Sequence, residues 1–165
     1  MAKSITSANS KLVITAASRN VAVNVAGSTG IEAIGALAGL LGVPTTLQGW
    51  SANQFLSASQ QTSAEVQLGI DDQMHVGWLP TLVPMQINLY PDSDSQDYLE
   101  QLTTIQMEMR ETLLITGVLI IPALQKQYSL TNGALQAHTP LPGHARVLQE
   151  QGTGFVFHKR IPMAY

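Results

Sequence analysis

Few residues of this chain combine the type and spacing that chemistry at a site requires. Histidines could bind a metal or transfer protons, but the four in this chain do not show the short spacings typical of metal ligands. They are His75, His138, His144 and His158. Asp71 and Asp72 are adjacent carboxylates that could act as acid and base. Their place between two strand-like segments instead predicts a solvated turn.

Other enzyme motifs are incomplete. The sequence Gly27-Ser-Thr-Gly30 resembles part of a phosphate-binding loop, but the lysine of that motif is missing. There is no Gly-x-Ser-x-Gly nucleophile elbow. The absence of cysteine excludes a thiolate metal site and a cysteine nucleophile. With eight basic residues and a net charge of −3, the chain also lacks the basic surface typical of nucleic-acid binding. We therefore predict no catalytic residue, no metal site and no cofactor.

The composition indicates that much of the surface is covered. The 165 residues fit one domain, and 45% are hydrophobic, whereas only 12% are charged. An ordinary soluble domain has roughly 25% charged residues. Burial in a membrane is disfavoured because the most apolar stretch, 31–43, is shorter than the roughly 20 residues that a spanning helix needs. The N-terminus does not resemble a secretory signal. We expect assembly in the cytoplasm, no membrane insertion, and a surface buried by partners.

A Gly- and Ala-rich apolar segment at about 26–46 has no clear period. We interpret it as an insertion or arm of a single domain, 1–165. Its larger apolar side chains are then candidates for a subunit interface. These are Ile31, Ile34, Leu37, Leu40 and Leu41. The alternative is a buried connecting helix.

Most of the chain favours β-strands. β-Branched runs and alternating patterns predict strands, with 112–121 as the best candidate for a central strand. The other predicted strands are 11–16, 20–25, 45–55, 64–70, 73–78, 81–90, 126–130, 134–139, 146–151 and 154–159. Asp71-Asp72 and Asn132-Gly133 predict tight hairpin turns. Pro80 and Pro84 favour an edge or bulged position for 81–90.

One amphipathic helix is predicted after residue 93. Ser93 and Gln96 fit a capping box. Apolar residues then recur at helical spacing, which gives the helix one apolar face. They are Tyr98, Leu99, Leu102, Ile105 and Met109. The expected fold is therefore mostly β, a barrel or sandwich of antiparallel strands with one flanking α-helix.

Charge is distributed unevenly along the chain. Nine of the eleven acidic residues lie between Glu65 and Glu111, a segment with Arg110 as its single basic residue. Such a polarised surface suits head-to-tail contact between identical subunits. A solvated acidic helix face is the equally plausible alternative.

The order of several short phrases resembles a family of small bacteriophage tail structural proteins. The resemblance covers about 43–160, and its phrases are Val43-Pro-Thr-Thr-Leu-Gln-Gly-Trp50, Gly77-Trp-Leu-Pro80, Leu119-Ile-Ile-Pro122 and Tyr128-Ser-Leu-Thr-Asn-Gly-Ala-Leu135. It implies a fold similar to the tail tube, whose subunits assemble into stacked rings, and it brings no catalytic residues. The segment 26–42 and the C-terminal 155–160 depart from the family pattern. They leave open whether the subunit forms the tube or a ring at its baseplate end.

The resemblance implies a structural virion protein of a phage tail. We expect a ring-forming homo-oligomer, hexameric, in the inner tail tube or at the tube–baseplate junction, around a channel through which DNA passes transiently. Neighbouring partners would be tail tube, sheath or baseplate proteins. Asp71, Asp72 and Asp92 are candidate lumen-facing acids. The alternatives are a tail fibre, spike or other baseplate attachment protein, and, from a different class, a small-ligand-binding barrel.

Overall fold

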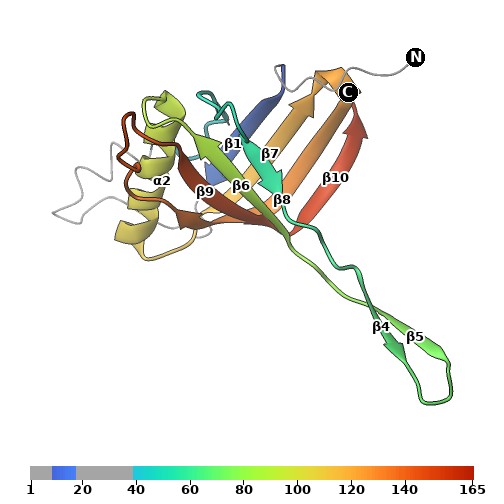
Figure 1. The fold of residues 1–165 in the computed structure, drawn as a ribbon. Helices are drawn as coiled ribbons and strands as arrows, with labels where there is room; N and C mark the ends of the chain where they lie inside the picture. The colour runs from blue at the N-terminus through green and yellow to red at the C-terminus, as the bar shows by residue number, and fades with distance from the viewer. Residues whose placement is uncertain (1–8, 18–38) are drawn as a thin grey trace.

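The computed structural model describes residues 9–17 and 39–165. In this part, ten strands, one α-helix and one 3₁₀ turn follow one another, and all strand pairs are antiparallel (Figure 1). The elements are β1 (Lys11–Ala17), β2 (Thr45–Thr46), β3 (Leu56–Ala58), β4 (Ala64–Leu68), β5 (Met74–Trp78), β6 (Val83–Leu89), α2 (Asp94–Met109), β7 (Leu114–Ile121), η1 (Pro122–Leu124), β8 (Lys126–His138), β9 (Gln151–Phe157) and β10 (Lys159–Ala164). The predicted fold class, mostly antiparallel β with one helix, is confirmed.

Eight strands form one sheet in the order β2-β1-β7-β8-β9-β6-β3, with β10 also paired to β8. β8 joins the two halves of this sheet, since its first half pairs with β7 and β10 and its second half pairs with β9. The two short outer strands belong to the same segment, 45–58, which pairs with β1 at its start and with β6 at its end. This segment therefore connects the two ends of the sheet.

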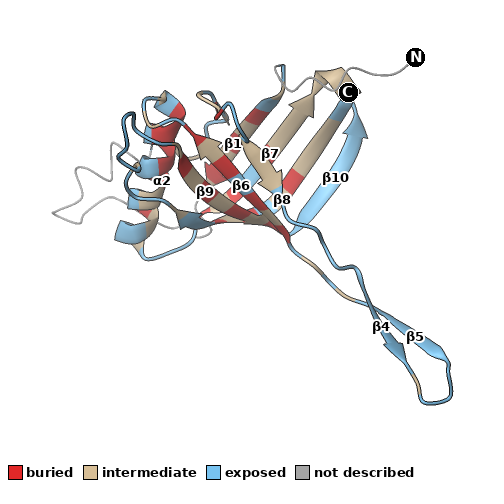
Figure 2. Cartoon of the chain, in the orientation of Figure 1, coloured by how far each residue is buried: buried red, intermediate tan, exposed pale blue. Residues whose placement is uncertain are grey.

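Alternation along the strands places every second side chain in one core. β9 shows this most clearly, because Gln151, Thr153, Phe155 and Phe157 are buried and the residues between them are not (Figure 2). The core combines side chains from β1, β6, β7, β8, β9 and α2. The helix contributes Tyr98, Leu99, Leu102 and Ile105, four of the residues predicted for its apolar face.

The helix begins as predicted. Ser93 is the N-cap, and its side chain accepts a hydrogen bond from the Gln96 N–H at 3.2 Å. The helix ends at Arg110, whose φ of 52° is left-handed. The Gln106 side chain donates to the Leu135 carbonyl at 3.3 Å, which ties the helix to β8. No helix in the described part of the chain has the length and hydropathy needed to cross a membrane.

The predicted hairpin at Asn132-Gly133 is wrong. β8 runs through both residues, and Asn132 has a φ of 52° within a bulge where the β7 register shifts. Gly133 is needed there because a Cβ would lie 2.4 Å from the Phe157 ring. The residue types that suit a tight turn therefore serve here to bend one long strand between the two halves of the sheet.

Two other predicted strands are shorter or missing. In 45–55, only Thr45–Thr46 is a strand, because the chain turns at Gly49 with a φ of 75° and packs closely on Ser93. In 146–151, the strand begins only at Gln151, since the preceding residues form a loop with a single bridge between His144 and Leu148. The predicted strand 20–25 lies outside the described residues.

Two prolines occupy sheet positions whose backbone nitrogen faces no strand. The Asn88 N–H donates to the Phe55 carbonyl, so the backbone nitrogens of the even-numbered β6 residues point toward the β3 side. β3 ends before the position opposite Pro84, so no strand faces the nitrogen of Pro84. The Tyr165 N–H donates to Gln125, so the nitrogen of Pro162 faces away from β8. β6 lies between β9 and β3 and is not an edge strand, but Pro84 lies where its β3 side is unpaired. The free edge of β10 lacks a donor at its centre.

Candidate assembly interface

The most unusual surface is the hairpin of β4 and β5, which projects from the body of the molecule (Figure 1). The predicted turn is present, with a three-residue loop rather than a two-residue one. The Gly69 N–H donates to the Gln73 carbonyl, and the Asp72 N–H donates to Gly69. Asp72 has a φ of 59°, the left-handed conformation that such loops place at their last residue.

The hairpin continues a strand pair of the body. β3 pairs with β6, and the chain leaves from one strand and returns to the other. Between body and hairpin, the Leu79 N–H donates to the Ser63 carbonyl at 3.1 Å, and the Gln61 side chain donates to the Leu82 carbonyl at 2.7 Å. These two bonds join the two chain segments that connect the hairpin to the body.

The register gives the hairpin one apolar and one polar face. Paired residues share a face, and successive residues alternate between faces. The apolar face consists of the pairs Ala64–Trp78, Val66–Val76 and Leu68–Met74. The polar face consists of Glu65–Gly77 and Gln67–His75. We call the first set the hairpin apolar face.

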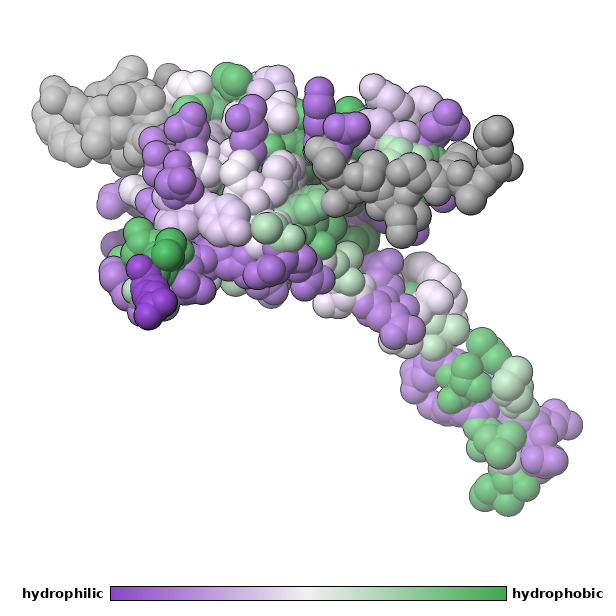
Figure 3. Space-filling model, turned by 45° about the horizontal axis from the view of Figure 1, so that its top comes forward, coloured by the Kyte–Doolittle hydropathy of each residue, from purple (hydrophilic) through white to green (hydrophobic). Residues whose placement is uncertain are grey.

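All six residues of the hairpin apolar face are exposed, and Trp78 retains 79% of its accessible surface. Figure 3 shows apolar side chains along the projecting hairpin. An isolated two-stranded hairpin is marginally stable in water, and fully burying one Val or Leu side chain contributes about 1.5–3 kcal/mol. A surface that covers this face would therefore stabilise both the hairpin and the complex.

The acidic residues predicted to face a lumen do not form one surface within a subunit. Asp71 and Asp72 lie in the turn at the tip of the hairpin, whereas Asp92 precedes α2 on the far side of the body (Figure 1). α2 carries further exposed acids, among them Asp97 and Glu100. The acidic segment of the sequence is thus divided between the hairpin and the solvent face of the helix.

The predicted interface residues of the Gly/Ala-rich segment lie mostly outside the described residues, as Ile31, Ile34 and Leu37 do. Leu40 and Leu41 are described, and both are partly buried against the core. The hairpin apolar face was missed as a site, although its alternation is visible in the sequence, because a strand packed on a core shows the same alternation.

The histidines are spread over the molecule. His75 lies on the polar face of the hairpin, His144 in a loop and His158 between β9 and β10. His138 Nδ1 lies 3.0 Å from the Thr153 hydroxyl, and burial lowers the pKa of His138, against the opposing effect of the Glu100 carboxylate. Within residues 9–17 and 39–165, no three His, Asp or Glu side chains are placed to hold a metal ion.

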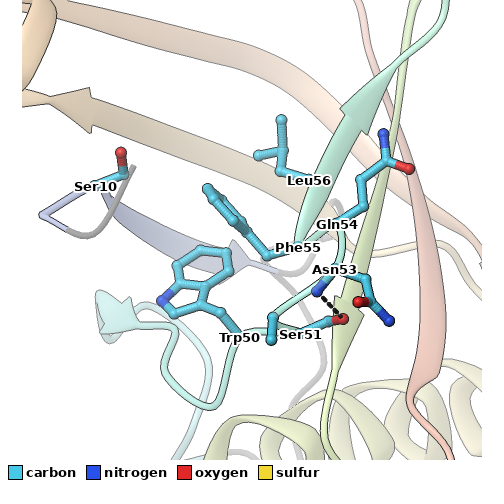
Figure 4. Close-up of a pocket in the computed structure, with 8 residues that line it drawn as sticks. Ser10, Trp50, Ser51, Asn53, Gln54, Phe55 and Leu56 are labelled. Atoms are coloured by element: carbon cyan, nitrogen blue, oxygen red, sulfur yellow. Dashed lines mark hydrogen bonds between the residues drawn. The ribbon is translucent and has the colours of Figure 1, made fainter. Parts of the chain in front are cut away.

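A cavity of about 490 Å³ lies between the start of β1 and β3, near Trp50 and Phe55 (Figure 4). The two rings meet edge to face with centroids 4.3 Å apart. The Ser51 hydroxyl, which also lines the cavity, accepts from the Asn53 N–H and donates to Glu150. The described lining residues are uncharged, so the cavity offers contacts for binding and no acid–base pair.

The sequence profile of the family described as tail fiber protein gp32 matches residues 23–160, which is most of the chain. The chain belongs to this family. It is therefore a bacteriophage tail structural protein, a component of the virion tail. No curated protein sequence matches this chain.

The solved structures that match this chain include parts of a prophage baseplate and of an extracellular contractile injection system. A chain of the anti-feeding prophage baseplate has 9% identity over 99% of this chain and 98% of that chain, with a TM-score of 0.47. A chain of the sheath–tube complex of an extracellular contractile injection system, PVC, in its extended state has 12% identity, 93% and 88% coverage, and a TM-score of 0.42. A chain of the PVC sheath/tube terminator has 12% identity, 93% coverage of both chains, and a TM-score of 0.41.

Proposed function

We propose that this gp32-family protein is a non-enzymatic subunit that assembles with copies of itself into a ring of the phage tail, in the inner tube or at the tube–baseplate junction. The observation that carries the proposal is the projecting hairpin with an exposed apolar face. In a lone subunit the hairpin apolar face stays exposed to water. In a closed ring, the hairpin of each subunit is buried against a neighbouring subunit.

Ring closure through the hairpin also fits the edges of the sheet. Strand pairing between subunits at β10 would be interrupted by Pro162, whose nitrogen faces the free edge. We therefore infer that side-chain packing of the hairpin, more than edge-to-edge strand pairing, holds neighbouring subunits together. The ring would be hexameric, would form in the host cytoplasm, and would contact tube, sheath or baseplate proteins.

A tail fibre or spike is the second candidate, and the family description, tail fiber protein, favours it. A ring of the tail and a fibre or spike differ in symmetry and shape. Electron microscopy of the purified protein, together with its mass in solution, tests the choice: six-fold rings or tubes support the first function, and three-fold rods support the second. A monomer at every concentration tested would contradict both.

The candidate lumen acids give a separate test within the ring proposal. Negative walls would keep passing DNA from adhering, because phosphates carry the same charge. Asp92→Lys, which lies before α2 and away from the hairpin, should then slow genome delivery by assembled particles. Asp71→Lys/Asp72→Lys is compared only in particles that contain as much of this protein as the wild type, because both residues lie on the projecting hairpin. Unchanged delivery by such particles of both variants would count against lumen-facing acids.

A further inference from the structure

The sheet offers a second uncovered surface, opposite to the core. In β1, β7, β8 and β10, the residues that alternate with the core residues form two rows across the strands. One row is Val13, Val118, Ser129 and Ile161, and the other is Lys11, Ile120, Gln127 and Met163. We call these eight residues the outer sheet face.

Five of the eight residues of the outer sheet face are apolar, and the face is partly exposed. Ile161 and Met163 retain 46% and 43% of their accessible surface, and Val13, Val118 and Ile120 are half-buried by their neighbours in the sheet. The helix contributes its buried side chains to the core cluster, which lies on the opposite side. The exposure of Ile161 and Met163 shows that the part of this face on β10 is open to solvent.

The charges of the two surfaces are complementary. β1, β7, β8 and β10 contain no acidic residue, and two of their cations, Lys11 and Lys159, alternate onto the outer sheet face. The hairpin, residues 64–78, contains no lysine or arginine, and it carries Glu65, Asp71 and Asp72. Two apolar surfaces of opposite charge within one chain favour a second copy of this chain as the partner.

We propose that the hairpin apolar face of one subunit lies across the outer sheet face of a second subunit, with the acidic turn near the basic residues around that sheet. This assignment rests on the ring assembly proposed above and names the surface that receives the arm. The contact is between subunits, because the hairpin points away from the sheet of its own chain (Figure 1). Each copy has one arm and one acceptor, so the contact repeats head to tail.

The natural lack of cysteine allows a direct test. The Val76→Cys variant is labelled at its cysteine with a photoreactive maleimide. It is then mixed with wild-type protein that carries no photoreactive group and contains heavy nitrogen, so that peptides of the two proteins differ in mass. Because Val76 is exposed, the substitution should leave the fold intact. After illumination, mass spectrometry should find the label on heavy peptides that contain Val118, Ile120, Ile161 or Met163. His75→Cys is the matched control, since it is one residue away on the polar face, and it should label these peptides severalfold less.

The outcomes separate this inference from the proposed function. If the mixture assembles and the label falls on other heavy peptides, or equally from both cysteine variants, the outer sheet face is not the acceptor, although ring assembly stands. If the wild-type protein stays monomeric at all concentrations, the second copy is the wrong partner and both proposals fail. A charge exchange adds independent support: Asp71→Lys/Asp72→Lys should weaken assembly, and mixing with Lys11→Glu/Lys159→Glu should restore part of it.

Discussion

Val66 and Val76 face each other across the hairpin, and each retains 58% of its accessible surface. Directly opposed valines stabilise a strand pair, yet this pair is bordered by water on the side where a core would lie. The pair is therefore placed to contact another molecule, and it is the centre of the hairpin apolar face.

Replacing both valines with serine should abolish or strongly weaken self-assembly. The loss should be about 1.5–3 kcal/mol for each valine that a partner buries fully. The body should keep its melting temperature, because neither side chain contributes to the core. Mass photometry across a concentration series measures the first effect, and thermal unfolding measures the second. The control Gln67→Ser/His75→Ser alters the polar face, and equal weakening by this variant would contradict a role specific to the apolar face.

Gly133→Ala should destabilise the fold by roughly 1–3 kcal/mol, as overpacking of a core typically does. The new Cβ would lie 2.4 Å from Phe157 and 2.9 Å from the Ile115 carbonyl, and the carbonyl belongs to the backbone and cannot rotate away. Gly77→Ala is the control, because a Cβ there meets nothing within 4 Å. Urea unfolding of the two variants measures the difference. Similar free energies of unfolding would show that the bulge in β8 adapts to a side chain.

Pro162→Thr should increase association between molecules at the edge of β10. The substitution adds an N–H that points away from β8, and exposed edge donors favour strand addition. Tyr165→Thr also introduces a threonine beside β10, but the N–H of residue 165 already donates to Gln125, so this variant should not have the effect. Light scattering at equal concentrations compares the two variants, and an increase with Tyr165→Thr alone would reverse the interpretation.

His138 should make the fold less stable in mild acid. Burial lowers the pKa of this histidine in the folded state, so the unfolded chain binds the proton more readily. Its contribution should be fully present above pH 6.5, the ordinary value, and should decline as the pH falls toward the folded-state pKa. His138→Gln should reduce this decline in urea unfolding measured on both sides of pH 6.5. His144→Gln, in an exposed loop, should leave the decline as in the wild type.

Structural elements that depend on residues adjacent in the sequence, such as a helix cap or a tight turn, were predicted correctly. Ser93 caps the helix because its hydroxyl can accept from the Gln96 N–H within the same turn. Asp71 and Asp72 form a hairpin turn for a similar reason, since aspartate tolerates turn dihedrals. Asn132 and Gly133 have equally suitable chemistry for a turn. Only the pairing of β8 with β7 on one side of the bulge and with β9 beyond it decides that they lie within one strand instead.

The site was harder to predict than the fold. The alternation of Val66, Leu68, Met74 and Val76 correctly predicts two strands, but the pattern is the same whether a core or solvent lies beside the apolar side chains. The low charge content indicated a surface that partners would cover, which stays a prediction. Charge content could not indicate which surface needs a partner, because the exposed face of β4 and β5 depends on where the hairpin leaves the sheet.

The position of the hairpin at the start of β6 also has a mechanical consequence. Tension on the hairpin would reach the body through residues 79–82 and pull on β6, which forms seven residue pairs with β9. A force along the strands loads those hydrogen bonds in shear, so several must break together, whereas a perpendicular force would open them one at a time. A tail built from such subunits would resist stretching most strongly along the direction of the arms.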